Sequence, residues 1–146
     1  MQANKSLNPS DWRGRAPLHW AALKGHLALV KLIASQVEDK NPADSSGWTP
    51  LHSAAKEGHF ELVKVIASQV EDKNPASSSG GTPLHVAAYD GHLAVTKHIS
   101  CLINDISPRT KYGSETPLDF AKEKNQKSVI EFLEHFQRDR DCPPPS

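Results

Sequence analysis

The histidines are the residues of this chain whose type and spacing could support chemistry. There are eight in 146 residues, and an imidazole can act as a general base, a metal ligand or a pH switch. Six recur every 33 residues in two sets, His19, His52 and His85, and His26, His59 and His92. No cysteine or carboxylate stands beside them at the spacing of a catalytic or metal site. The regular spacing therefore indicates a structural role, and we expect no catalytic residue, no metal site and no cofactor.

Other sequence signatures of enzymes are also missing. The sequence contains no phosphate-binding loop, no carboxylate pair at catalytic spacing and no nucleophile elbow. The acidic pairs Glu38-Asp39 and Glu71-Asp72 simply repeat at the 33-residue interval. We predict that the protein is not an enzyme.

The first set of histidines belongs to a longer motif that predicts where helices begin. Thr-Pro-Leu-His occupies 49–52 and 82–85, Ala-Pro-Leu-His occupies 16–19, and Thr-Pro-Leu-Asp occupies 116–119. Threonine is a good helix N-cap, and proline suits the first helical position because its missing N–H is not needed there. Spacings of 33, 33 and 34 residues indicate four stacked repeats.

The second set marks the end of each of these short helices and the start of another. Glycine precedes His26, His59 and His92, and we expect it to end the first helix in the left-handed conformation. Asn125 takes this place in repeat four. The following second helix is apolar over a wide arc in the inner repeats. In repeat four its apolar residues narrow to one side, as expected of a C-terminal cap.

The first repeat leaves two alternatives open. The segment 27–33 reads like an interior helix, and Ala16 lacks the capping hydroxyl of its counterparts. Either residues 1–9 fold over the apolar face of this segment, or further repeats lie upstream. A marked gain in stability on extending the native chain upstream would favour the second alternative.

Two further marks keep the same register, namely Asn-Pro at 8, 41 and 74 and glycine at 14, 47, 80 and 113. With the motifs above they make the chain resemble the ankyrin-repeat family over residues 8–137. The resemblance implies an all-α solenoid of four helix-turn-helix repeats with short β-hairpin-like loops. We expect one domain over 1–137, with repeats at about 8–40, 41–73, 74–106 and 107–137, and a disordered tail over 138–146. The family resemblance also implies that the first set of histidines binds the capping threonine and adjacent backbone, and that the second set ties neighbouring loops.

Composition limits the possible partners. Seventeen acidic and seventeen basic residues give a formal net charge of zero, so the basic excess typical of nucleic-acid binding is absent. No apolar run approaches the roughly 20 residues of a membrane span, and residues 1–11 lack a signal-peptide core. We expect a soluble monomer inside the cell, in the cytoplasm or nucleus. Cys101 and Cys142 show no disulfide framework, and we interpret Cys101 as a small buried apolar residue.

In this family, partners usually bind a concave groove lined by hairpin tips and first helices. The resemblance therefore implies a protein-protein interaction module. The predicted binding residues at matching positions are Trp12, Arg13, Arg15, Leu23, Lys24, Trp48, Lys56, Glu57, Tyr89, Asp90, Tyr112 and Glu123. Trp12, Trp48 and Tyr89 are candidate anchors, because aromatic residues dominate interface energetics. Trp20 is expected to pack between first helices.

Charge along the expected groove is uneven. Basic residues lie toward repeats one and two, and acidic residues toward repeats three and four, although Lys111 and Lys124 weaken this division. We therefore expect a partner segment with acidic residues near repeats one and two.

Two other functions stay open. The hairpins of repeats two and three are rich in serine, which is compatible with a spacer or a fragment of a longer array in a multidomain protein. Asn41 and Asn74 match the hairpin asparagine that hypoxia-pathway asparaginyl hydroxylases modify in many ankyrin repeats. The chain could therefore be a hydroxylation substrate.

Overall fold

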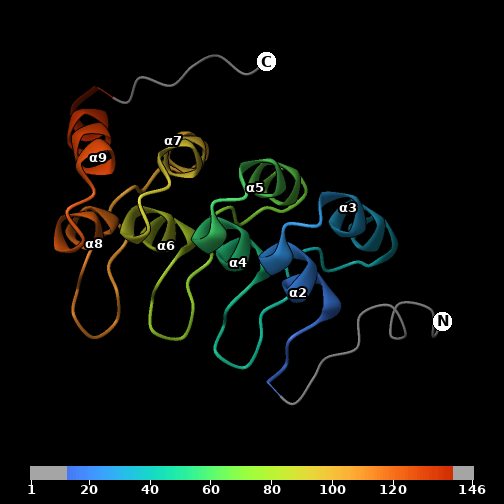
Figure 1. Ribbon diagram of the computed structural model, residues 1–146. Helices are drawn as coiled ribbons and strands as arrows, with labels where there is room; N and C mark the ends of the chain where they lie inside the picture. The colour runs from blue at the N-terminus through green and yellow to red at the C-terminus, as the bar shows by residue number, and fades with distance from the viewer. Residues whose placement is uncertain (1–12, 140–146) are drawn as a thin grey trace.

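The computed structural model describes residues 13–139, a range with eight helices and no strands. The first helices of the four repeats are α2 (Pro17–Lys24), α4 (Pro50–Glu57), α6 (Pro83–Tyr89) and α8 (Pro117–Glu123). The second helices are α3 (Leu27–Gln36), α5 (Phe60–Ala67), α7 (Leu93–Leu102) and α9 (Lys127–Asp139). Figure 1 shows the two sets as parallel rows, with long loops projecting beyond the first helices. The prediction of an all-α solenoid of four repeats is confirmed.

The Thr-Pro pairs start the first helices as predicted. At three starts the threonine hydroxyl accepts a hydrogen bond from the backbone N–H three residues later, at 3.3 Å for Thr49 and 3.2 Å for both Thr82 and Thr116. Proline follows each cap inside the first turn. Ala16 has no side-chain hydrogen bond to offer. Repeat one therefore starts without the cap that stabilises the other three.

The first helices end in the left-handed conformation expected of them. Gly58 has φ 73°, and Asn125 has φ 56° at the equivalent place in repeat four. A Cβ on Gly58 would lie 2.6 Å from Nδ1 of His92 in the next repeat. Glycine is therefore needed here both for its backbone conformation and for the space that the neighbouring ring occupies.

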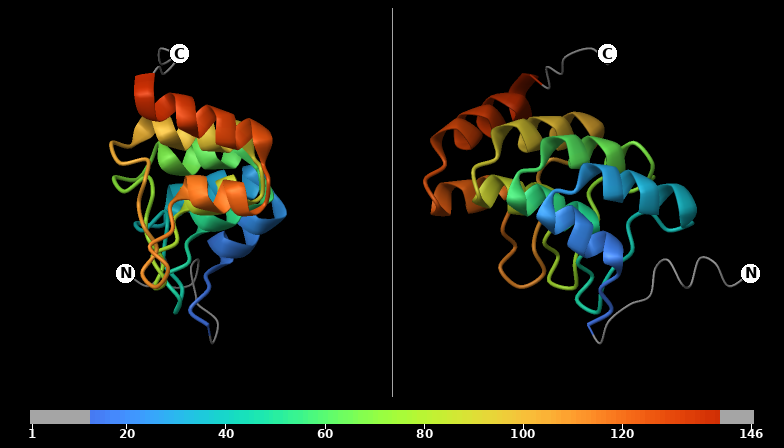
Figure 2. Two further views of the ribbon diagram at one scale, coloured as in Figure 1. Left: turned by 90° about the vertical axis from the view of Figure 1, so that its left-hand side faces the viewer. Right: turned by 45° about the vertical axis from the view of Figure 1, so that its right-hand side comes forward.

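The core is a slab between the two rows of helices (Figure 2). Leu18, Leu51 and Leu84, one from each of the first three first helices, are fully buried. At the C-terminal end Leu133 and Phe136 of α9 are also buried. Because each repeat packs mainly on its neighbours, the core extends along the whole stack.

Helix α9 differs from the other second helices in its length and in its outer surface. It has exposed charges at Lys127, Glu131 and Glu134, so its outer side faces water as a terminal repeat requires. It runs to Asp139, two residues past the expected end of the domain at 137. None of the helices within residues 13–139 has the length and apolar character needed to cross a bilayer.

Cys101 requires a correction. It is half-buried on α7 and packs against the core, but it is disulfide-bonded. It is therefore not the simple apolar residue expected from the sequence. Cys142 lies outside the described residues.

Candidate partner-binding surface

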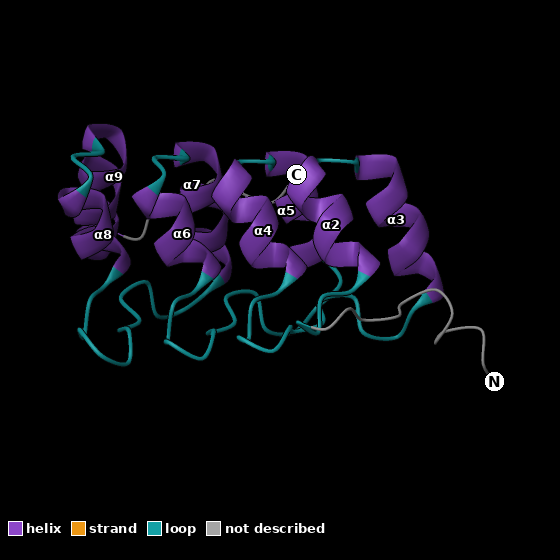
Figure 3. Ribbon diagram, turned by 60° about the horizontal axis from the view of Figure 1, so that its bottom comes forward, coloured by secondary structure: helices purple, strands orange, loops and turns teal. Residues whose placement is uncertain are grey.

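We call the surface made by loops 42–48, 75–81 and 109–115 and the four first helices the hairpin face. Figure 3 shows these loops side by side along one edge of the stack. Each described tip donates a backbone hydrogen bond of 2.8 Å to the preceding one, from Ser45 to Arg13, from Ser78 to Ser46, and from Lys111 to Ser79. These bonds set the spacing between successive tips, so the loops form a continuous row.

The first set of histidines ties each first helix to the following repeat. Nε2 of His19, His52 and His85 lies 2.8, 3.0 and 2.8 Å from the carbonyl oxygens of Trp48, Gly81 and Glu115, respectively. Because a carbonyl only accepts, each Nε2 carries the proton. Nδ1 then accepts from the N-cap backbone N–H in all three repeats. Both ring nitrogens are therefore committed to structural bonds.

Burial favours the neutral form of His52 and His85. The pKa of His52 is lowered to about 4, mainly because burial disfavours the charged imidazolium, although the bond to Gly81 and the charge of Asp44 oppose the shift. Burial also lowers the pKa of His85. In repeat four Asp119 takes the histidine's place. Its carboxylate accepts from the Thr116 N–H at 3.0 Å, and this bond lowers its pKa.

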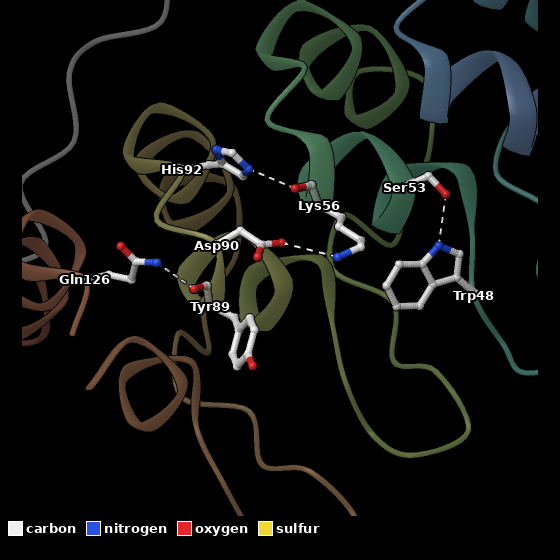
Figure 4. A network of polar contacts seen from close by, with 7 residues as sticks. All are labelled: Trp48, Ser53, Lys56, Tyr89, Asp90, His92 and Gln126. Atoms are coloured by element: carbon white, nitrogen blue, oxygen red, sulfur yellow. Dashed lines mark hydrogen bonds and ion pairs between the residues drawn. The ribbon is translucent and has the colours of Figure 1, made fainter. Parts of the chain in front are cut away.

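In the second set, His59 and His92 each hold the end of the first helix of the preceding repeat. Nε2 of His59 lies 3.2 Å from the carbonyl oxygen of Leu23, and Nε2 of His92 lies 2.8 Å from that of Lys56. In repeat four the amide of Gln126 donates to the carbonyl of Tyr89 at 2.9 Å (Figure 4). The role of Gln126 was missed from the sequence, although its place directly after Asn125 was a usable signal.

Trp48 is half-buried and packed against its own repeat. Its ring stacks on His52 with 4.7 Å between centroids, and its Nε1 donates to Oγ of Ser53 at 2.9 Å. One side of the indole is thus used for packing. The partly exposed remainder is held in a fixed orientation on the hairpin face.

Tyr89 lies one repeat further along and is also half-buried. Its ring meets the edge of Phe120 at 5.8 Å between centroids, and Nζ of Lys124 lies 5.2 Å from the ring centre. The neighbouring Asp90 forms an ion pair of 3.7 Å with Lys56. In the view of Figure 4 this pair lies between the rings of Trp48 and Tyr89. The structure thus gathers four predicted residues from two repeats.

Repeat one contributes a different aromatic residue. Trp12 lies outside the described residues, whereas Trp20 is 42% exposed, with the guanidinium of Arg15 4.3 Å from its ring centre. The expectation that Trp20 packs between first helices is therefore wrong. Leu23 is half-buried and Lys24 exposed on the same helix.

The remaining predicted residues are spread over the surface. Arg13, Glu57 and Glu123 are exposed, and Tyr112 is 86% exposed in the fourth hairpin. The extra residue in this hairpin places Ser114, rather than a glycine, in the left-handed conformation with φ 52°. The insertion therefore changes how Tyr112 is presented relative to the earlier tips.

The two candidate hydroxylation residues brace the loops. Oδ1 of Asn41 accepts from the backbone N–H of Leu51 at 2.9 Å, and Oδ1 of Asn74 accepts from that of Leu84 at 3.0 Å. Both asparagines are half-buried. These bonds give them a structural role.

Comparison with known families agrees with this architecture. The family model described as "Ankyrin repeats (3 copies)" matches residues 2–77, and that described as "Ankyrin repeat" matches residues 79–109. The chain belongs to the ankyrin repeat family. No curated protein matches it significantly. Ankyrin repeats are generally protein-interaction modules and are typically non-catalytic.

Proposed function

We propose that the hairpin face binds a segment of a partner protein and that the chain performs no catalysis. The observation that carries this proposal is the group formed by Trp48, Tyr89 and the Lys56–Asp90 ion pair. Two half-buried aromatic rings and a charged pair come from repeats two and three, and in the view of Figure 4 the pair lies between the rings. An interface commonly combines aromatic anchors with polar groups in this way.

The group is also held in place before binding. The Trp48 indole is fixed by its stack on His52 and its bond to Ser53. The carbonyls of Lys56 and Tyr89 are tied to the next repeat by His92 and Gln126. A surface that is already ordered loses little conformational entropy on binding. This supports the hairpin face as the recognition surface.

The test is affinity capture from the native cell, followed by calorimetry with the purified partner. The Tyr89→Ala variant and the Lys56→Ala, Asp90→Ala double variant are compared with Glu61→Ala and Lys97→Ala. The last two change exposed residues of second helices, away from the hairpin face. We expect the hairpin-face variants to lose about tenfold or more in affinity and the controls to bind normally. Equal losses in both groups, with unchanged circular dichroism, would refute the proposal.

We also propose that the working form is a monomer in the cytoplasm or nucleus. The disulfide of Cys101 is uncommon in these reducing compartments, so the redox state of this thiol in the cell is part of the test. Sedimentation velocity of the purified chain and imaging of the tagged protein test both parts. A stable dimer or a secreted product would contradict them.

A spacer within a longer array is the competing function. Ser45, Ser46, Ser78 and Ser79 are exposed at the tips of repeats two and three, and such small side chains bury little area in an interface. If the capture experiment finds no protein that depends on the hairpin face, the spacer becomes the better explanation.

Hydroxylation of Asn41 and Asn74 stays a prediction from the family resemblance. The bonds from their side chains to Leu51 and Leu84 explain these residues without it. Intact-mass analysis after incubation with an asparaginyl hydroxylase tests it directly. No added oxygen would remove this function.

A further inference from the structure

Helix α3 exposes two leucines, Leu29 at a position that the later repeats bury and Leu32 at a position that they half-bury with Val65 and His98. Leu29 is 43% exposed and Leu32 is 55% exposed. The residues 33 and 66 positions after Leu29 are Leu62 and Val95, which are only 2% and 1% exposed. In repeats two and three the second helix packs on that of the preceding repeat, α5 on α3 and α7 on α5. Within residues 13–139, no preceding second helix packs on the Leu29 side of α3.

The ring of His26 also has no hydrogen-bond acceptor within residues 13–139 on the side where a preceding repeat would lie. The equivalent rings of His59 and His92 each bond a carbonyl at the end of the preceding first helix. His26 is exposed, and no group within residues 13–139 hydrogen-bonds its ring. A polar group and an apolar surface are thus both unmatched on the side where a preceding repeat would lie.

The sequence ahead of α2 carries the motif that follows a second helix elsewhere in the chain. Asn41-Pro42 follows α3, and Asn74-Pro75 follows α5. Asn8-Pro9 stands in the same register, and the family match already begins at residue 2. The ankyrin pattern therefore starts upstream of the first described helix.

We propose that His26, Leu29 and Leu32 form a stacking surface for another ankyrin repeat, joined to the chain ahead of α2. The second helix of that repeat covers the two leucines. A carbonyl in the last turn of its first helix accepts from Nε2 of His26, as the carbonyls of Leu23 and Lys56 accept from the histidines of the following repeats. This inference is independent of what binds the hairpin face.

A covalently joined repeat fits this surface better than a second copy of the chain. Two leucines form a small apolar patch, whereas a stable dimer buries roughly 1,200 Å² or more. A joined unit docks at high effective concentration, so a small patch is enough. Head-to-tail stacking of copies is also unfavourable, because the outer side of α9 presents Lys127, Glu131 and Glu134.

The experiment inserts a copy of residues 41–73 between Leu7 and Asn8 of the full chain, so that Asn8 follows the copied Lys73 as Asn74 follows Lys73 naturally. Amide exchange of α3 is measured by mass spectrometry in the natural and extended proteins. Each is also made with His26→Ala and with Leu29→Gln plus Leu32→Gln. His59→Ala in the natural chain is the matched control for a histidine that already has its partner.

We expect α3 to exchange roughly tenfold more slowly in the extended protein, and both sets of substitutions to reverse this gain. In the natural chain they should change exchange by less than about twofold, whereas His59→Ala should accelerate it clearly.

Unchanged α3 exchange in an extended protein whose circular dichroism shows the added helices would overturn the proposal. The proposal would also be overturned if the His26 and Leu29/Leu32 substitutions changed α3 exchange equally in the natural and the extended protein. A dimer of the natural chain that Leu29→Gln plus Leu32→Gln abolishes would identify a second copy as the occupant instead. If the copied unit does not fold, a copy of residues 74–106 replaces it, and failure of both to fold on α3 counts against the proposal.

Discussion

Nε2 of His52 donates to the carbonyl of Gly81, 29 residues later, across 3.0 Å. The same ring accepts at Nδ1 from the Thr49 N–H at 3.1 Å. One imidazole thus stabilises the start of its own helix and the junction with the next repeat. The bond at Nδ1 requires the neutral ring with its proton on Nε2, because a protonated Nδ1 could not accept.

The first prediction is that stability falls between pH 6.5 and about 4. The pKa of His52 is lowered from 6.5 to about 4 by burial, so the unfolded chain binds more protons in this range. The stabilisation is complete above pH 6.5 and is lost as the pH falls toward 4, by about 3 kcal/mol at most. Urea unfolding at pH 7 and pH 4.5 measures the change. His52→Gln should unfold with a smaller pH dependence, and an identical dependence in both proteins would contradict the assignment.

The second prediction concerns the helix caps. Thr82→Ala should lower the free energy of unfolding by about 1 kcal/mol, because the backbone N–H of His85 loses its acceptor. Ala16→Thr should raise stability by up to about 1 kcal/mol, since it supplies the hydroxyl that repeat one lacks. Denaturant midpoints of the two variants measure this. Shifts in the same direction would show that the hydroxyl is not what caps these helices.

The third prediction concerns Ser100, whose buried hydroxyl has no hydrogen-bond partner among residues 13–139. The residues at this register in repeats one and two are Ala34 and Ala67, both buried. Ser100→Ala should therefore stabilise the protein by about 1 kcal/mol, since it removes an unpaired buried polar group. Ala67→Ser is the reverse control and should destabilise it by a similar amount. Thermal melts that leave both midpoints unchanged would mean that the hydroxyl finds a partner.

The fourth prediction compares two glycines. Gly58→Ala should cost about 1–3 kcal/mol, because φ is 73° and the new Cβ would meet the His92 ring at 2.6 Å. Gly81→Ala should be neutral or stabilise by up to about 1 kcal/mol, because the new Cβ would lie 3.6 Å from the Ser77 hydroxyl, an ordinary contact distance. Chemical denaturation of the two variants separates these effects. Equal losses would show that the strain does not reside at Gly58.

The helices and their ends could be predicted because local residues determine them. Thr49 caps its own helix, and Asn125 adopts the left-handed conformation because asparagine tolerates it better than most other residues with a side chain. The register also predicted which histidines are structural. Comparing registers more closely would have found Ser100, since alanine stands at both earlier positions.

The orientation and exposure of side chains on the hairpin face could not be predicted as closely as the helices. The orientation of Trp48 depends on a ring and a hydroxyl on the following helix, His52 and Ser53. Trp20 stays 42% exposed, with the Arg15 guanidinium over its ring at 4.3 Å from the centre. Such contacts follow from packing between segments, which a pattern of residue types does not specify.

The last prediction concerns the charge of the partner. Of the basic residues expected to attract acidic groups, Lys56 is already paired with Asp90 at 3.7 Å, so its charge is partly neutralised. Lys24 is exposed and forms no ion pair within residues 13–139. Lys24→Glu should therefore weaken binding more than Lys56→Glu, chiefly through slower association at low salt.

The difference in association rate between the Lys24→Glu and Lys56→Glu variants should shrink as salt is raised, because screening acts most strongly on exposed charges. Surface plasmon resonance at 50 and 300 mM NaCl with the captured partner measures it, with Lys97→Glu on the second-helix side as the control for net charge. If Lys24→Glu and Lys97→Glu behave alike, the partner responds to overall charge and the acidic segment near repeat one is excluded. If only Lys24→Glu slows association, the acidic end of the partner lies beside α2.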